Sequence, residues 1–90
     1  MIDKTVVITN PLGIHARPAA LIVQEAAQFA AEITLSKGDV AHINGKSIMG
    51  VMMLAAENGA EVTITADGDD EVEALEKIAA LMQSNFEDTV

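Results

Sequence analysis

Polar and apolar side chains alternate with a period of two in three stretches of this chain, residues 1–9, 31–43 and 60–66. Their content of valine, isoleucine and threonine predicts β-strands. A turn at 37–39, which contains a glycine, divides the middle stretch into a hairpin of two short strands. The pattern therefore predicts four strands.

Three other stretches carry apolar residues three and four positions apart, the spacing of a helix with one buried face. They predict helices over about 16–30, over 47–55, and from Asp69 as N-cap to 83 or 84. The expected core positions are Ala19, Ile22, Val23, Ala26, Phe29 and Ala30 in the first helix and Val72, Leu75, Ile78, Ala79 and Met82 in the third. Residues 85–90 are expected to form a frayed tail.

The order of elements is therefore βαββαβα in a single domain, with short connections. Strands combined with helices that are apolar on one side favour an α+β fold, in which an antiparallel sheet carries its helices on one face. Ninety residues are enough for one modest core without disulfides or metals.

The predicted helix at 47–55 carries two apolar stripes, about a third of a turn apart. The first stripe consists of Val51, Leu54 and Ala55, and the second of Ile48, Met49 and Met52. A short helix that is apolar on most sides is either deeply buried or part of an interface. Methionines suit surfaces that meet several partners, because their side chains can repack. The pattern alone does not decide between core and docking surface.

Composition excludes several classes of function. The chain has no cysteine and two histidines, which argues against disulfides, thiol chemistry and a structural zinc site. No apolar run approaches the roughly 20 residues that a membrane span needs, and the N-terminal residues do not read as a signal peptide. We therefore expect a cytoplasmic protein. A net charge of -9 argues against a nucleic-acid partner.

The acidic residues are unevenly distributed. No aspartate or glutamate occurs in 4–24 or in 40–56, and most acids follow Gly59. If the two acid-free stretches meet in space, they form a neutral-to-basic, apolar face on an acidic protein. Such a face would dock an acidic partner and would spare a bound phosphate from repulsion.

The first acid-free stretch contains a candidate site for phosphate chemistry. A turn-forming run at 10–14 leads to His15, and Pro18 suits the first turn of the helix that follows. Free backbone N–H groups and the dipole at a helix N-terminus favour an anion, and Arg17 adds a fixed positive charge. These features point to phosphate carried on His15 itself. The alternative is a solvated loop histidine or a capping residue.

Two strings in the chain resemble the motifs of one family. Gly-Ile-His-Ala-Arg-Pro-Ala at 13–19 closely resembles the active-site signature of HPr, the histidine phosphocarrier family of bacterial phosphotransferase systems. Gly-Lys-Ser-Ile-Met-Gly-Val-Met at 45–52 resembles the regulatory-serine segment of that family. The resemblance runs nearly from end to end. It implies an open-faced β-sandwich in which the short second helix lies beside the active loop.

The resemblance also implies a function. His15 would accept a phosphoryl group from phosphorylated enzyme I, which takes it from phosphoenolpyruvate, and would pass it to a histidine on an enzyme IIA domain. Arg17 would balance the phosphate charge. Such a protein is a phosphocarrier rather than an enzyme that turns over small molecules by itself. No cofactor or metal is implied, and we expect a monomer.

Ser47 has two interpretations that are compatible with each other. It is a plausible N-cap of the short helix. It also aligns with the serine that an HPr kinase/phosphorylase modifies in many bacteria, where the change would weaken docking. The expected docking residues for enzyme I, enzyme IIA domains and a transcriptional regulator are Leu21, Lys46, Ile48, Met49 and Met52.

Departures from the family pattern leave the pathway open. The spacing from His15 to Ser47 is one residue longer than in the best-known sugar-system members. The segments at 52–55 and 86–88 look like NPr, the nitrogen-related branch, whereas the intact motif at 45–47 favours a sugar-system carrier. A regulatory binding module that docks a partner without transferring phosphate is a third hypothesis.

Overall fold

The computed structural model describes residues 1–9, 13–14, 16–54 and 56–84. The elements in chain order are β1 Ile2–Val7, α1 Ala16–Ala26, β2 Glu32–Lys37, β3 Val40–Asn44, α2 Ile48–Met53, β4 Glu61–Asp67 and α3 Glu71–Gln83. This is the predicted βαββαβα order. The expected tail at 85–90 and the position of Ala55 lie outside the described residues.

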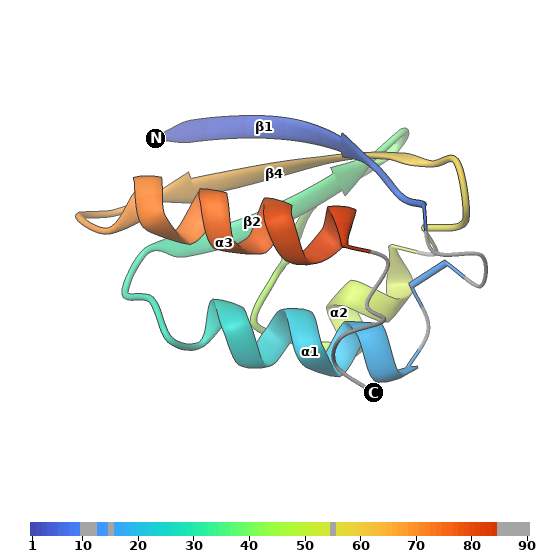
Figure 1. The fold of residues 1–90 in the computed structure, drawn as a ribbon, viewed down its shortest axis with the longest axis horizontal. Helices are drawn as coiled ribbons and strands as arrows, with labels where there is room; N and C mark the ends of the chain where they lie inside the picture. The colour runs from blue at the N-terminus through green and yellow to red at the C-terminus, as the bar shows by residue number, and fades with distance from the viewer. Residues whose placement is uncertain (10–12, 15, 55, 85–90) are drawn as a thin grey trace.

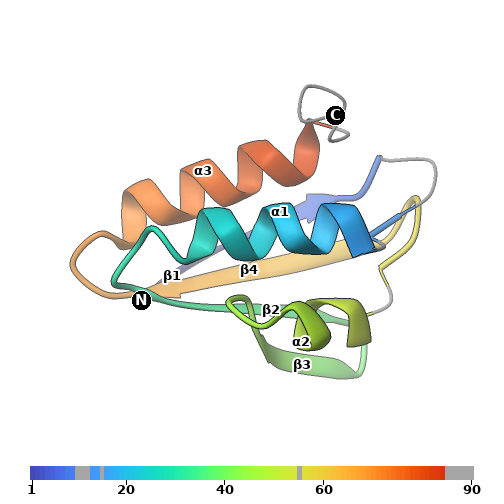
Figure 2. The same ribbon diagram turned by 90° about the horizontal axis from the view of Figure 1, so that it is seen from below.

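The four strands form one sheet in the order β1-β4-β2-β3, and each neighbouring pair is antiparallel. Helices α1 and α3 lie side by side over one face of this sheet, while α2 lies next to β3 and to the first turns of α1 (Figures 1 and 2). The predicted α+β open-faced sandwich is therefore confirmed.

The core lies between the sheet and the two long helices. Alternate strand residues point into it, which explains the period of two: Val62, Ile64 and Ala66 of β4 are fully buried, while their neighbours are not. In the helices the buried residues are Pro18, Ala19, Ile22 and Ala26 of α1 and Ala74, Leu75, Ile78, Ala79 and Met82 of α3. The core contains no buried charged side chain among the described residues.

The first helix is shorter than the pattern predicts. It ends at Ala26 rather than near 30, because the backbone N–H of Phe29 donates to the carbonyl of Ala26, 3.2 Å away, and tightens the turn. The chain then turns toward β2. Phe29 stays buried as expected, but Ala30 is exposed and Val23 is only half-buried.

The third helix differs from its prediction at its start. Asp70, not Asp69, is the N-cap, and its carboxylate makes no cap bond within its own helix. Instead the Asp70 carboxylate accepts hydrogen bonds from the backbone N–H groups of Ala30 and Ala31, each 2.9 Å long. Val72, expected in the core, is 58% exposed. It lies in the first turn at the margin of the apolar stripe, and Ala74 on the other margin is buried in its place.

Candidate functional site

His15 lies outside the described residues, but the chain on both sides of it is described. Before it, the backbone N–H of Ile14 donates to the carbonyl of Ala56, 2.8 Å away. Gly13 is buried against the same segment with φ +71°, so that a Cβ added to it would lie 2.6 Å from the carbonyl oxygen of Ala56. The approach to His15 is therefore fixed to the chain that follows α2.

After His15, α1 begins at once with Ala16. Pro18 is buried in the first turn, where its missing N–H costs no hydrogen bond, and Arg17 is exposed. The first turn contains no acidic residue. The predicted helix start beside a cationic side chain is confirmed, and this end of α1 favours an anion.

Ser47 is the N-cap of α2. Its backbone is extended, with φ -118° and ψ 120°, and its Oγ accepts a hydrogen bond from the backbone N–H of Gly50, 3.1 Å away. The segment before it is held as well, because the backbone N–H of Gly45 donates to the carbonyl of Ile33, 2.8 Å away. The structural interpretation of Ser47 is thus confirmed, and its hydroxyl sits at the start of a helix that lies beside the start of α1.

The ammonium of Lys46 is directed to the protein's own backbone. Its Nζ donates a hydrogen bond of 2.7 Å to the carbonyl of Phe29, just beyond the end of α1. The backbone N–H groups of Ala30 and Ala31, and to a smaller degree the positive charge of Lys46, keep the pKa of the Asp70 carboxyl below its ordinary value. Lys46 therefore connects the Ser47 segment to the turn that follows α1.

The second apolar stripe of α2 is on the surface and not in the core. The exposed fractions are 45% for Ile48, 76% for Met49, 44% for Met52 and 68% for Met53, whereas Val51 and Leu54 are fully buried. We call these four exposed residues the α2 surface. Met53 was not among the expected docking residues, although its position four residues after Met49 places it on the same side of a helix.

The helix that carries the α2 surface lies close to the start of α1. Helices α1 and α2 contact each other, and both ribbon views place α2 beside the first turns of α1 (Figures 1 and 2). The two acid-free stretches of the sequence therefore meet, as the resemblance to HPr implied, and the condition set by the charge pattern is fulfilled. Leu21 of α1 is half-buried and packs against the core.

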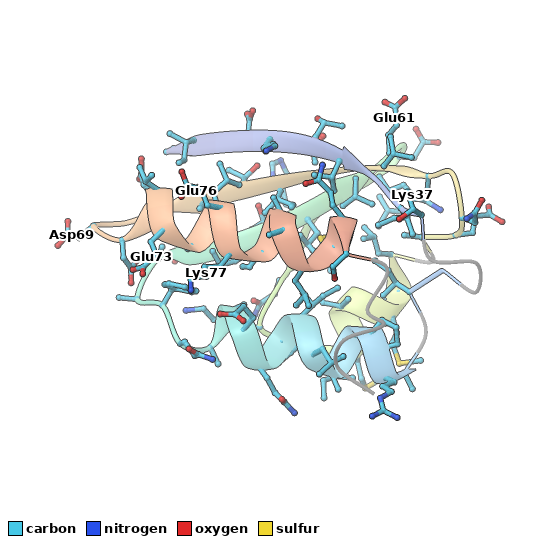
Figure 3. All side chains as sticks on the ribbon, in the orientation of Figure 1. Lys37, Glu61, Asp69, Glu73, Glu76 and Lys77 are labelled. Carbon is cyan, nitrogen blue, oxygen red and sulfur yellow. The ribbon has the colours of Figure 1, made fainter. Side chains whose placement is uncertain are left out.

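Two acidic side chains near the start of α3 lie far from the start of α1, whereas Glu61 of β4 lies toward the same end of the molecule as that start. Figure 3 shows Asp69 and Glu73 near the start of α3, at the end opposite to the first turn of α1. A negative group bound at the start of α1 is therefore distant from these carboxylates.

A hollow of about 340 Å³ lies over β2 and β3 and is lined by Glu32, Ile33, Thr34, His42, Asn44 and Lys46. Of these residues only Lys46 belongs to the expected site. Within the described ranges, no three histidine or acidic side chains are grouped as metal ligands would be. No helix in these ranges is long and apolar enough to cross a membrane.

Comparison with known proteins identifies the family. The family model PTS-HPr, described as the PTS HPr component phosphorylation site, matches residues 2–84. The chain belongs to the HPr family. HPr proteins are phosphocarriers of the phosphotransferase system and are not catalytic enzymes.

Two curated members of the HPr family show how similar the chain is to known proteins. It is 50% identical to the phosphocarrier protein HPr of Treponema pallidum over 88 residues, which cover 98% of this chain and 99% of that protein. It is 51% identical to the HPr-like protein Crh of Bacillus subtilis over 83 residues, which cover 92% and 96%. Both an HPr and a Crh are therefore similar to this chain at nearly full length.

Solved HPr structures confirm the fold. An HPr from Thermoanaerobacter tengcongensis matches with a TM-score of 0.88 at 44% identity, covering 96% of each chain. An HPr from Bacillus anthracis matches with a TM-score of 0.85 at 49% identity, covering 91% of this chain and 96% of that one. A second structure from T. tengcongensis, with a TM-score of 0.73 at 44% identity and covering 96% and 98%, is an HPr dimer, so the expected monomeric state is not confirmed.

Proposed function

We propose that this HPr-family chain accepts a phosphoryl group on His15 from phosphorylated enzyme I and passes it to enzyme IIA domains of the sugar phosphotransferase system. The observation that carries the proposal is the start of α1 directly after His15, with no acidic residue in the first turn. Free backbone N–H groups and the helix dipole at this position favour a phosphate.

The chemistry needs only the imidazole and its surroundings. A lone pair on a ring nitrogen of His15 forms the bond to phosphorus while the bond between phosphorus and the donor group breaks. In the second step the same nitrogen is the leaving group, because neutral imidazole is stable near neutral pH. Arg17 balances the charge of the phosphate. Strong stabilisation of phospho-His15 would slow the second step, so an exposed arginine suits a carrier.

The α2 surface is the proposed docking site for enzyme I and for enzyme IIA domains. It is apolar, exposed and next to the start of α1, so a partner that covers it also reaches the neighbourhood of His15. A partner histidine must approach the phosphate closely, and docking on an adjacent apolar surface supplies that proximity.

Ser47 is the proposed regulatory residue. A phosphate on its hydroxyl would stand at the N-terminus of α2, where negative charge is tolerated, so the fold is expected to survive. The same phosphate would place about two negative charges beside the α2 surface. Docking of enzyme I is then expected to weaken. An HPr kinase that phosphorylates Ser47 would thus switch docking off.

A phosphorylation assay tests the proposal. The chain is mixed with phosphoenolpyruvate and enzyme I, beside His15→Ala, and the product is examined by intact mass and phosphorus NMR. An acid-labile, base-stable phosphate on the unmodified chain and none on the variant is expected. A folded sample that takes no phosphate from either a sugar-type or a nitrogen-type enzyme I would refute the carrier role. If only the nitrogen-type enzyme I donates, the NPr-like branch replaces the sugar branch.

The similarity to Crh favours a second candidate, a regulatory binding module. One of the matched structures is described as the Bacillus subtilis catabolite repression HPr, Crh. In this alternative the α2 surface docks a regulator, and phosphate transfer to enzyme IIA plays no part. A partner retained by His15→Ala, together with the absence of phosphotransfer by the unmodified chain, would favour this candidate.

A further inference from the structure

The α2 surface has an unusual composition. Three of its four residues are methionines, and these hold three of the five methionine sulfurs in the chain. Met49, Met52 and Met53 are 76%, 44% and 68% exposed. A leucine would supply the same apolar area without a sulfur that reacts with oxidants. Most of the sulfur atoms that an oxidant can attack therefore lie on the surface where the partners are proposed to dock.

From this placement we infer that the α2 surface is a site of reversible methionine oxidation, which switches docking off. The inference rests on the proposed function, because it assigns a regulation to the docking site proposed above. The oxidant is a hydroperoxide, with hydrogen peroxide as the simplest member of that class. The affected groups are the thioether sulfurs of Met49, Met52 and Met53.

The reaction of hydrogen peroxide with the thioether balances without any other group from the protein. A lone pair on the sulfur attacks one peroxide oxygen, the O–O bond breaks and an S–O bond forms. The other oxygen leaves as water after taking up the proton of the transferred oxygen. Sulfur loses two electrons, which the peroxide gains. Reductases that act on methionine sulfoxide return the thioether, so the change is reversible.

Oxidation would alter the α2 surface and spare the fold. A sulfoxide is polar and must lose its water when a partner covers it, so docking on an apolar surface weakens. The residues that hold α2 in place are Val51 and Leu54, which are fully buried and carry no sulfur. The Ser47 cap bond also involves no sulfur.

The other two methionines provide internal controls. Met82 is fully buried in α3, and Met1 is 78% exposed but belongs to the segment before β1, outside the α2 surface. With mild peroxide, peptide mass spectrometry should find sulfoxide first on Met1, Met49 and Met53, later on Met52, and on Met82 only after unfolding. If Met82 in the folded protein reacts as fast as Met49 and Met53, the structural basis of the inference is wrong.

The functional test measures phosphotransfer from enzyme I before and after peroxide. Oxidation is expected to raise the KM for this chain about tenfold, the effect of about 1.4 kcal/mol of lost docking energy. The kcat is expected to stay constant, because the sulfurs do not take part in the transfer step. Treatment with methionine sulfoxide reductases A and B should restore the KM. An unchanged KM on a chain shown by mass to be fully oxidised at Met49, Met52 and Met53 would overturn the inference.

A matched variant separates these sulfurs from Met1. The triple variant Met49→Leu, Met52→Leu, Met53→Leu keeps Met1 and Met82, and whatever its own starting KM, peroxide is expected to leave that KM unaltered. If peroxide raised the KM of this variant as much as that of the unsubstituted chain, the effect would come from a site other than these three methionines, and the inference would be refuted. If the untreated chain accepts no phosphate from enzyme I, the proposed function itself fails and this regulation falls with it. Phosphotransfer that is the same before and after oxidation is a different result, because it refutes the regulation and leaves the proposed function standing.

Discussion

The α-carbon of Gly13 faces the carbonyl of Ala56 so closely that a Cβ at position 13 would lie 2.6 Å from that oxygen. Because the neighbouring N–H of Ile14 donates to the same carbonyl, the chain before His15 is attached to the chain after α2 by a contact that only glycine allows. This contact relates the proposed phosphorylation site to the proposed docking helix.

Gly13→Ala is expected to lower the free energy of unfolding by about 2 kcal/mol or more, since alanine would meet both a backbone clash and a positive φ. Urea unfolding measures the change. Gly38→Ala is the matched control: its φ is +55°, but nothing lies within 4 Å of an added Cβ, so only about 1 kcal/mol should be lost. If the free energy of unfolding fell equally in the two variants, the contact between Gly13 and Ala56 would not be tight.

Ser47→Ala is expected to cost about 1 kcal/mol of stability, because the N–H of Gly50 loses its acceptor. Ser47→Asp keeps an acceptor at the N-cap, so its free energy of unfolding in urea should be close to that of the unsubstituted chain. It should nevertheless raise the KM for phosphotransfer from enzyme I, as a negative charge then stands beside the α2 surface. Phosphotransfer to Ser47→Asp at the unsubstituted rate would contradict the regulatory role.

Lys46→Gln is expected to lower the free energy of unfolding by about 1 kcal/mol, because the carbonyl of Phe29 loses a charged donor at 2.7 Å. Lys77→Gln makes the same change of charge on an exposed position of α3 and should have little effect. Thermal or urea unfolding compares the two variants. If they behave alike, the Lys46 hydrogen bond contributes no net stability.

The Asp70 carboxylate predicts a pH dependence of stability. Its pKa is lowered in the folded state by the N–H groups of Ala30 and Ala31, so it contributes stability at neutral pH and loses that contribution as pH falls below its ordinary value of 3.8. Asp70→Asn should reduce stability at pH 7 and flatten the acid limb of the profile. Asp69→Asn, a change at the exposed neighbouring position, should leave the profile of the unsubstituted chain in place.

Most features of this fold that depend on neighbouring residues in the sequence were predicted correctly. The order of strands and helices, the burial of Ile64 and Ile78 and the N-cap at Ser47 all follow from side-chain pattern and capping chemistry. The meeting of α2 with the start of α1 was implied by the resemblance to HPr, whereas the charge pattern only said what the two acid-free stretches would form if they met.

The errors arise where residues distant in sequence decide the outcome. The end of α1 depends in part on Asp70, whose carboxylate lies 39 to 40 positions further along the chain than the N–H groups it binds. Local capping rules predicted Asp69 as the N-cap of α3 and could not predict that Asp70 binds N–H groups so far away in the sequence. The hydrogen bond from Lys46 to the carbonyl of Phe29 could not be predicted from spacing either, and the docking role of Lys46 stays a prediction. Met53, by contrast, could have been found by extending the helical pattern from Met49 by four positions.

The strand order has a consequence for how the chain is made. Among the described strands, β1 pairs with β4 alone, so that Thr5 pairs with Thr63, 58 positions later in the sequence. Strand β2 also pairs with β4 along one of its edges. In a nascent chain, β1 therefore has no partner strand until β4, at residues 61–67, has been synthesised. Such distant pairings slow folding relative to helical bundles of this size. The sheet cannot form before β4 is available, and a fragment that ends before residue 61 contains no part of β4 and cannot complete the sheet.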